Sequence, residues 1–521
     1  VMKTSIGTEI PEFIDKKKGR GRLKPFEGAW TRLQKGWMDE PTVSLPTKAK
    51  MPHVSKMEKD LKTAIEKTGP RDGMTVSFHH HLRNGDAIVN LTIDILAELG
   101  IKNITLAASS LTSVHRHLIP YLEDGTITEI WTSGMRDELG TAVSMGKLAY
   151  RAVIHSHGGR ARAIRTGELS IDLAVLAASA ADEEGNATGC HGPSAFGSMG
   201  YAIMDARYAK QVIVVTDNIV PYPCFPVSIE QTNVDYVVKV DSLGDVKKIA
   251  SGTTRITKKP LDLRLASLCA QVIEHSGYME NGFSFQVGAG GASLAAAKYV
   301  NETMKKRGIK GSFLLGGVTS YVVELMEQGL FESVFDVQSF DAAVSSSLLN
   351  NRNHIEISSD MYANPFNCGS MINKLDVVVL GALAVDVNFN VNVITGSEGT
   401  IMGASGGHCD TAAGAKLTVV VCPSFRGRIP SIKRNVHHIV TPGESVHVIV
   451  TERGICVNPA YKDLEARLKK SGLFIRDIHD LQDRVDKLTG VPDPIEYKDR
   501  VVAVIEYRDG TTIDVVRQIK C

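Results

Sequence analysis

The chain repeats part of its own sequence, and this repeat limits the available folds more than any other feature. The segment Asp172–Thr188 (DLAVLAASAADEEGNAT) is matched 204 residues later by Asp376–Asn392 (DVVVLGALAVDVNFNVN). Segments that start at Lys210 and Lys416 match at an offset of 206, and a third match, starting at Thr75, has an offset of about 207. Three matches in one order at nearly one offset indicate two related domains in tandem.

Each repeat begins with the same order of elements, and this order predicts the fold class. A strand leads into a polar or glycine-rich turn, which is followed by a helix and a second strand. Apolar residues at helical spacing and a glycine after the last turn identify the helices. Alternating strands and helices favour parallel pairing, so we expect an α/β fold of two tandem domains with mainly parallel sheets. The expected elements are 75–78, 88–99 and 104–108 in the first repeat, and 283–287, 293–307 and 312–315 in the second.

The repeats divide the chain into three predicted parts. Residues 1–69 form an N-terminal arm, because their first fifty positions combine two Trp residues, many Lys residues and weak periodicity. We expect this arm to be extended, and either packed on a partner or loose. The first repeat covers residues 70–257 and the second covers residues 258–521.

Charge and apolar content argue against several classes of function. The 521 residues include 59 Lys and Arg against 58 Asp and Glu, a net charge of +1, which disfavours nucleic-acid binding and membrane attachment through bulk charge. The first residues lack the apolar core of a signal peptide, and the longest apolar run, Val377–Val385, is too short to span a bilayer. The eight cysteines form no CxxC pair and are typical of a reducing compartment. We therefore expect a soluble protein of the cytoplasm.

The strongest local motif is the glycine-rich stretch TGSEGTIMGASGGHCDTAAGAK at residues 395–416. Glycine loops expose backbone N–H groups that bind carboxylates, phosphates and oxyanions. The acid in this stretch could act as a nucleophile or base, or it could be a solvated residue in a tight crossover. The candidate catalytic residues are Gly406, Gly407 and Glu398, and the candidate substrate-binding residues here are Ser397, Ser405 and His408.

A second glycine cluster, Gly288-Ala289-Gly290-Gly291, lies at a predicted strand-to-helix turn. Such a turn can bind an anion, or it can serve close packing of the helix on the strand. The dinucleotide fingerprint GxGxxG would need Gly or Ala at Ser293, so we expect no nicotinamide cofactor.

The sequence His79-His80-His81-Leu82-Arg83 ends the first strand of the first repeat. Alternation along an extended chain places His79 and His81 on one face and His80 on the other. These donors suit an anionic substrate, and a purely structural role is the alternative. A zinc site would need further ligands that the sequence does not identify, so we expect no metal.

Four stretches resemble the alpha chains of citrate lyase, within the CoA-transferase superfamily. They are TVSFHHHLRNGD (75–86), TGELSIDLAVLAASAADEEGNATG (166–189), GASGGHCDTAAGAKL (403–417) and VTERGICVNPAY (450–461). The resemblance covers essentially the whole chain. It implies two halves of one shared fold, in agreement with the internal repeat.

The resemblance also implies a reaction. Acetyl-carrier protein or acetyl-CoA exchanges its acyl group with citrate, acetate leaves and a citryl thioester forms. It implies no covalently bound cofactor, a CoA or phosphopantetheine-type thioester as co-substrate, and a homo-oligomer within a larger complex with acyl-carrier (gamma) and lyase (beta) subunits. By motif position, His79, His80, Arg83, Ser109 and Ser110 join the substrate-binding set, and the thioester arm is expected at Gly288, Gly290, Gly291, Gly316, Gly317 and Arg426.

One departure from the superfamily bears on mechanism. Other CoA transferases carry a nucleophilic Glu in a Glu-Asn-Gly tripeptide after the second strand of the second half, where this chain has Gly316-Gly317-Val318. Glu280-Asn281-Gly282 lies one strand too early. The resemblance therefore implies direct attack of citrate on the thioester through a mixed anhydride. The alternatives are a transferase for citramalate or malonate, a hydrolase or CoA transferase that uses Glu398 covalently, and a metabolite sensor without catalysis.

Overall fold

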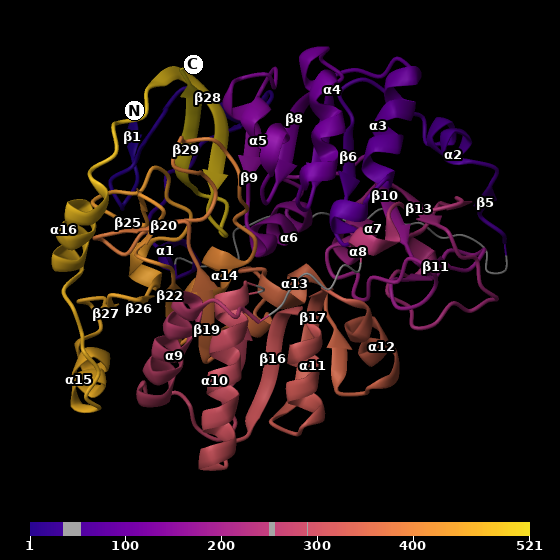
Figure 1. Ribbon diagram of the computed structural model, residues 1–521. Helices are drawn as coiled ribbons and strands as arrows, with labels where there is room; N and C mark the ends of the chain where they lie inside the picture. Colours follow the sequence, from indigo (N-terminus) through magenta and orange to yellow (C-terminus); the bar gives the residue numbers. More distant parts are fainter. Residues whose placement is uncertain (35–53, 250–255, 289, 521) are drawn as a thin grey trace.

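Two sheets with the same strand order form the centre of the protein (Figure 1). The computed structural model describes residues 1–34, 54–249, 256–288 and 290–520, so residues 35–53 of the predicted arm, Ala289 and Cys521 lie outside the described residues. In order across the first sheet, the strands of the first repeat are β9 (Ala152–Ile154), β8 (Ile127–Thr132), β7 (Ile104–Ala108), β6 (Thr75–Phe78), β10 (Leu173–Ala178), β13 (Gln211–Thr216) and β14 (Tyr236–Lys239).

The second sheet repeats this order strand for strand. It runs β18 (His354–Glu356), β17 (Phe331–Ser339), β16 (Gly311–Val318), β15 (Phe285–Val287), β19 (Val377–Gly381), β22 (Leu417–Val421) and β26 (Val448–Thr451), with β27 (Gly454–Val457) antiparallel at its edge. All pairs between β18 and β26 are parallel, as are those between β9 and β14. The predicted fold class is confirmed.

The repeat extends to individual hydrogen bonds. Asp172 accepts the backbone N–H of Thr75 at 2.9 Å and pairs with Lys210 at 2.8 Å. In the second half, Asp376 accepts the N–H of Ser284 at 2.8 Å and pairs with Lys416 at 2.7 Å. The equivalent carboxylates thus connect three strands at the same end of each sheet, which explains why they recur in sequence.

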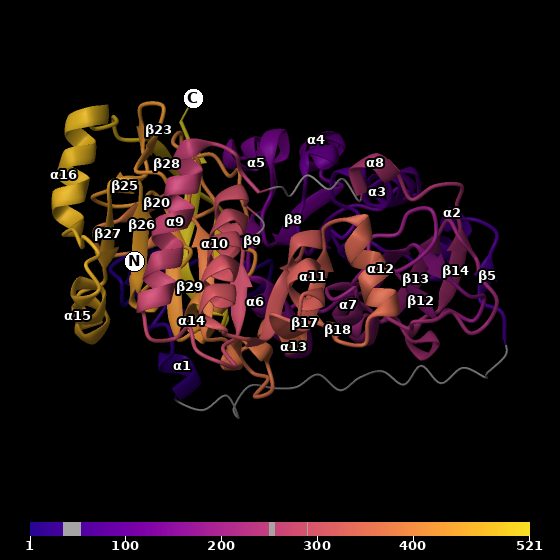
Figure 2. The ribbon, with the colours of Figure 1, turned by 60° about the horizontal axis from the view of Figure 1, so that its bottom comes forward.

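Helices connect the parallel strands, as crossovers of this kind require. Figure 2 shows α9, α10, α11 and α12 side by side against the second sheet. Helix α2 (Leu61–Lys67) precedes the first repeat, whose described helices are α3 (Ile88–Glu98), α4 (Ile119–Glu123), α5 (Asp137–Ser144), α6 (His157–Arg165), α7 (Ala202–Tyr208) and α8 (Val246–Ile249). Those of the second repeat are α9 (Pro260–His275), α10 (Gly291–Arg307), α11 (Ser320–Glu327), α12 (Ala342–Asn350), α13 (Ser359–Ala363), α14 (His408–Gly414), α15 (Lys462–Lys470) and α16 (Ile478–Thr489). No helix within the described ranges is long and apolar enough to cross a bilayer.

The C-terminal residues return to the first half. Strands β28 (Tyr497–Glu506) and β29 (Thr512–Ile519) extend the first sheet, with β28 parallel to β9. In Figure 1 these yellow strands lie beside β9, far in sequence from the indigo and magenta elements around them. The sequence division placed residues 258–521 together in the second repeat, whereas this hairpin pairs with the first sheet.

The described part of the arm packs on its own chain. Its hairpin of β3 (Asp15–Lys17) and β4 (Arg20–Arg22) carries Lys16, whose buried ammonium forms ion pairs with Glu168 and Glu506. Further along, the N–H of Ala29 donates to Glu444 of the second half at 2.6 Å. These residues of the arm are therefore not loose, because the buried Lys16 ion pairs and the hydrogen bond to Glu444 hold them on their own chain.

Candidate functional site

A cavity of about 620 Å³ lies where the carboxyl ends of both sheets meet. Ligands of α/β folds bind at these strand ends, because the connecting loops there are free to vary. The first half contributes His80, Arg83, Asn84, Ser110, Thr112, Ser133, Arg136, His157 and Tyr201. The second contributes Gln286, Val287, Gly288, Gly290, Ser293, Gly317, Val337, Gln338, Phe340, Tyr362, Leu380, Gly381, Val393, Ala404, Ser405, Gly406, Gly407 and His408.

The described residues that line the cavity are rich in hydrogen-bond donors. Two arginines, three histidines, hydroxyls and amides line the cavity, and no Asp or Glu occurs among the described lining residues. A cavity with many donors and no carboxylate suits a polyanionic substrate. It also offers no acidic side chain as a nucleophile.

The glycine turn that precedes α14 reaches into the first half. The N–H of Ser405 donates to the Ser133 carbonyl at 2.7 Å, and the N–H of His157 donates to the Gly406 carbonyl at 2.8 Å. Gly406 has a φ of +53°, which suits a residue without a side chain. The N–H groups of Gly406 and Gly407 make no hydrogen bond in the described part of the chain, so two donors remain for a substrate oxygen.

The first half has the same turn, and sequence reasoning missed it. Helices α7 and α14 start at Ala202 and His408, which are 206 residues apart, so Tyr201 occupies the place of Gly407. Its ring stacks on His80 at 4.8 Å between centroids and contacts the His157 ring in a tilted arrangement at 4.4 Å. Burial raises the pKa of Tyr201 well above its ordinary value, so the hydroxyl stays protonated. The repeat offset itself could have identified this residue.

His80 is a neutral donor whose orientation is fixed. Ser109 Oγ accepts the backbone N–H of His80 at 3.0 Å, and lies 2.6 Å from its Nδ1. Gln338 Oε1 can only accept, so the Nε2 of His80, 3.1 Å away, carries the hydrogen, and the Nδ1 of the neutral ring accepts from the Ser109 hydroxyl. Burial and the neighbouring histidines hold the pKa of His80 well below its ordinary value.

His157 lies at the N-terminus of α6. Burial, reinforced by Arg160, lowers its pKa to about 3, so the ring is neutral. Its Nδ1 is buried and has no hydrogen-bond partner among the described residues. The His157 ring lines the cavity, while this nitrogen is turned into the protein.

Tyr362 and Gln286 form the wall behind Gly407. Gln286 Nε2 donates to the Tyr362 hydroxyl at 2.9 Å. A Cβ placed on Gly407 would lie 2.5 Å from this hydroxyl, so only glycine fits without movement. Burial raises the pKa of Tyr362, and the phenol stays neutral.

Arg83 and Arg136 supply positive charge at the cavity. Burial and the nearby Arg136 lower the pKa of Arg83. The guanidinium of Arg83 lies over the Phe340 ring, 4.9 Å from its centroid. Its backbone φ is 54°, in a region that non-glycine residues rarely adopt. The chain therefore accepts backbone strain to place this side chain.

His408 connects elements of the second half rather than offering donors to a ligand. Its Nε2 lies 2.9 Å from the Gly381 carbonyl, and its Nδ1 lies 2.7 Å from the Thr441 hydroxyl. Burial lowers its pKa to about 4, so a neutral ring uses both nitrogens in these bonds. The predicted binding role of its side chain does not fit this arrangement.

Seven predicted site residues do not line the cavity. Ser109 supports His80 from behind, and His79 is buried against His81 and the Ala177 carbonyl. Gly316 packs on Gln286, and Arg426 is exposed and bonded to the carbonyls of Ala382 and Leu383. The other three are Gly291, at the start of α10, and the exposed Ser397 and Glu398. Their loop folds near Tyr497 and Ile495, which draws it away from the glycine turn.

The other predicted residues meet at the cavity: His80, Arg83, Ser110, Gly288, Gly290, Gly317, Ser405, Gly406, Gly407 and His408. No group of three or more His, Cys, Asp or Glu side chains within the described ranges is arranged to hold a metal. Arg136, Tyr362 and Gln338 lie outside the resembling motifs, and only the folded chain reveals their place.

Comparison with known proteins agrees with this geometry. Residues 54–519 match the sequence family "Citrate lyase, alpha subunit (CitF)". The citrate lyase alpha chains of Escherichia coli K12 and Klebsiella pneumoniae are each 50% identical, over 88% of this chain and 90% and 91% of theirs.

Solved structures extend the comparison. An alpha subunit of citrate lyase from Streptococcus mutans, determined in complex with citrate, is 47% identical with a TM-score of 0.94 and full coverage of both chains. The malonate decarboxylase alpha subunit of Acinetobacter baumannii shares the fold at 17% identity, with a TM-score of 0.58 over 81% of this chain and 93% of that one. The match over nearly the whole length confirms the resemblance seen in the sequence, and the chain belongs to the citrate lyase alpha subunit family.

Proposed function

We propose that this cavity exchanges the acetyl group of an acetyl thioester for citrate, releasing acetate and forming a citryl thioester. The observation that carries the proposal is the pair of N–H groups at Gly406 and Gly407, which have no partner among the described residues, in a cavity whose described lining is rich in donors and contains no carboxylate. Family membership and the citrate complex of the Streptococcus mutans protein support citrate as the acid.

The proposed chemistry has two acyl transfers. A citrate carboxylate oxygen attacks the acetyl carbonyl, the C–S bond breaks, and an acetyl–citryl anhydride and a thiolate form. The thiolate then attacks the citryl carbonyl, and acetate leaves with the bridging oxygen. Both tetrahedral intermediates carry an oxyanion, which the N–H groups of Gly406 and Gly407 stabilise.

The remaining lining residues bind and orient the reactants. Arg83 and Arg136 compensate the charge of citrate, and the Tyr201 hydroxyl adds a neutral donor. Bringing the carboxylate and thioester together in this cavity supplies the proximity that the reaction needs. The thioester belongs to CoA or to the phosphopantetheine-type arm of an acyl-carrier subunit, and a separate lyase subunit consumes the product. We place the protein in a cytoplasmic hetero-oligomer that contains several copies of it.

The first experiment follows the purified chain with acetyl-CoA and citrate by mass spectrometry. One citryl-CoA per acetate is the expected result. Acetate without citryl-CoA would instead identify a hydrolase. Competition among citrate, citramalate and malonate defines the acid.

Oxygen labelling then tests the mechanism. In a single turnover with carboxyl-¹⁸O citrate, direct attack places one citrate oxygen in the acetate. An enzyme carboxylate as nucleophile would place its own unlabelled oxygen there, and would also release acetate from acetyl-CoA before citrate is added. Unlabelled acetate would therefore contradict the mixed-anhydride route.

A further inference from the structure

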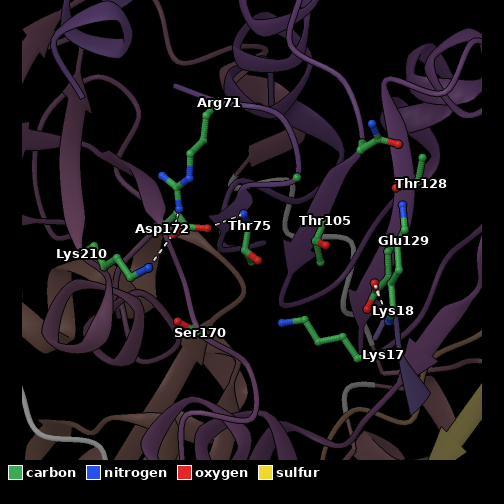
Figure 3. A pocket seen from close by; sticks show the side chains of 12 residues that line it. Lys17, Lys18, Arg71, Thr75, Thr105, Thr128, Glu129, Ser170, Asp172 and Lys210 are labelled. Carbon is green, nitrogen blue, oxygen red and sulfur yellow. Dashed lines mark hydrogen bonds and ion pairs between the residues drawn. The ribbon is translucent and has the colours of Figure 1, made fainter. Parts of the chain in front are cut away.

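A second cavity, of about 210 Å³, lies at the opposite end of the first sheet (Figure 3). It is lined by Thr75, Thr105 and Thr128, which stand at the first or second position of β6, β7 and β8. The catalytic cavity lies at the carboxyl ends of these strands, so the two cavities are separated by the length of the sheet. Nothing in the proposed acyl exchange uses this second cavity.

A row of hydroxyl groups faces this cavity. Thr75 and Thr105 are direct neighbours in the register of β6 and β7, and Thr128 follows on β8. The hydroxyls of these three residues and of Ser170 make no hydrogen bond within the described part of the chain. The threonines are less than a tenth exposed, and their hydroxyls are not among the fully buried atoms, so they remain accessible from the cavity.

Positive charge surrounds the hydroxyls. Lys17 and Lys18 of the arm approach from one side, and Arg71 and Lys210 lie on the other. Asp172 is held between Arg71, at 2.7 Å, and Lys210, at 2.8 Å, and its pKa is lowered although burial opposes this. The only other carboxylate among the described lining residues is Glu129. Four cations against two carboxylates leave an excess that suits a dianion.

The second repeat shows which of these features the fold requires. Its equivalent pair, Asp376 and Lys416, is present, so this ion pair belongs to the shared framework. The hydroxyl of Ser284, which stands in the place of Thr75, is bonded to the Lys374 carbonyl at 2.8 Å. Phe313 stands in the place of Thr105 and packs on Phe335. The free hydroxyls are therefore a property of the first repeat alone.

We propose that this cavity is a binding site for a phosphate group. A phosphate has about two negative charges near neutral pH and several strong acceptor oxygens, which match the cations and hydroxyl donors. Because Lys17 belongs to the arm while Thr75 and Lys210 belong to the first repeat, the bound anion joins the arm hairpin to the sheet. Phosphate binding therefore also stabilises the folded chain.

Titration calorimetry of the full chain with inorganic phosphate tests the site. Lys210→Met removes one cation at an exposed position, and Thr75→Val with Thr105→Val removes two hydroxyls with little change of shape. Each change is expected to weaken phosphate binding about tenfold or more. The matched control is Lys416→Met, which breaks the equivalent ion pair in the second repeat and leaves the affinity unchanged.

A second control distinguishes phosphate binding at this cavity from binding at the catalytic cavity. Arg83→Gln alters the catalytic cavity and is expected to leave phosphate affinity unchanged. The proposal is overturned if the wild-type chain shows no saturable binding at millimolar phosphate. It is also overturned if only Arg83→Gln weakens binding, or if citrate binds at Thr75 and Thr105 while phosphate does not. A phosphate-dependent rise in melting temperature that Lys210→Met abolishes and Lys416→Met preserves supports it independently.

Discussion

Gly407 is a residue at which one methyl group should disrupt catalysis. A Cβ there would stand 2.5 Å from the Tyr362 hydroxyl, so either the tyrosine or the glycine turn must move. Displacement of an oxyanion donor by about an ångström can cost roughly 100-fold in rate. We expect Gly407→Ala to lower kcat/KM for citryl-CoA formation by about that factor, and Gly407→Val to abolish it.

The control for this prediction lies in the same cavity. A Cβ on Gly290 would have no heavy atom within 4 Å, so Gly290→Ala should retain most of the activity. Tyr362→Phe removes the clashing oxygen and should restore part of the rate in Gly407→Ala. Full activity of Gly407→Ala would show that the turn does not hold the oxyanion.

Two glutamates test the absence of an enzyme nucleophile. Glu280 lies before β15, at the end remote from the cavity, and Glu398 lies on an exposed loop. We expect Glu280→Ala and Glu398→Ala each to keep kcat within about twofold, since exposed residues away from a site contribute little. Loss of turnover in either variant with an unchanged melting temperature would refute the mixed-anhydride route for this chain.

Sequence reasoning identified backbone donors better than side chains. Gly406 and Gly407 stand out because a glycine cluster between two strands has few structural explanations. Tyr362 and Gln338 carry no such signal, since single aromatic and amide residues are common in cores. Glu398 does not line the cavity, because nearness in sequence to the glycine turn does not determine which way the loop closed by the Thr395–Ile401 bridge folds.

At the scale of elements, the internal repeat predicted that the two sheets share one strand order, which local sequence patterns could not predict. Matching β10 with β19 and β13 with β22 determines that both sheets have one strand order. The hairpin of β28 and β29 has no counterpart in the other half, so the repeat carried no information about its partner. Its place beside β9 depends on an open sheet edge that exists only in the folded chain.

The arm hairpin should contribute strongly to stability through Lys16. Its ammonium is buried and forms ion pairs with Glu168 and Glu506, which Arg162 also contacts. Removing one partner from a buried ionic group typically costs about 3–5 kcal/mol. We expect Lys16→Met to lower the free energy of unfolding in urea by about that amount.

A second lysine of the same arm provides the control. Lys3 pairs with Glu9 across β1 (Met2–Lys3) and β2 (Glu9–Ile10), and both side chains are exposed. Exposed pairs contribute at most about 1 kcal/mol, so Lys3→Met should change stability little. Equal effects of the two substitutions would show that the arm is held by contacts other than the buried ion pairs.

At the scale of the whole molecule, the two halves meet at the cavity. The described side chains that face one another there are mostly neutral and polar. His80, Tyr201 and His157 of the first half face Gln286, Gln338 and Tyr362 of the second. Burial keeps these rings uncharged, which leaves the arginines as the permanent charges there. The protein thereby binds an anion at its centre without carrying a strongly basic surface.

This arrangement has a consequence for stability in acid. Burial lowers the pKa of nine histidines (His79, His80, His81, His155, His157, His408, His437, His438 and His447), so in the folded chain they stay neutral below pH 6.5. The unfolded chain takes up protons on these residues as pH falls below about 6.5, and its free energy falls relative to the folded state. These groups therefore stabilise the fold above that pH and lose this contribution in acid.

Carboxyl groups act in the opposite direction, but they are fewer. Burial raises the pKa of Asp410 to about 6 and of Asp514 to about 7, and it also raises the pKa of Glu129, Asp205, Glu356 and Asp386. In the folded state these acids keep protons that the unfolded state has lost, so their contribution to the stability of the fold increases as pH falls. The nine histidines outnumber these six carboxyls, so we expect a net loss of stability on acidification between pH 6.5 and 5.

Urea unfolding at several pH values measures this slope directly. We expect the free energy of unfolding to fall steadily from pH 6.5 to pH 5, and His438→Gln to reduce the slope by about one proton because it removes one of the nine groups. A stability that stays level or rises on acidification would show that the buried carboxyls, and not the histidines, determine the response of the molecule to pH.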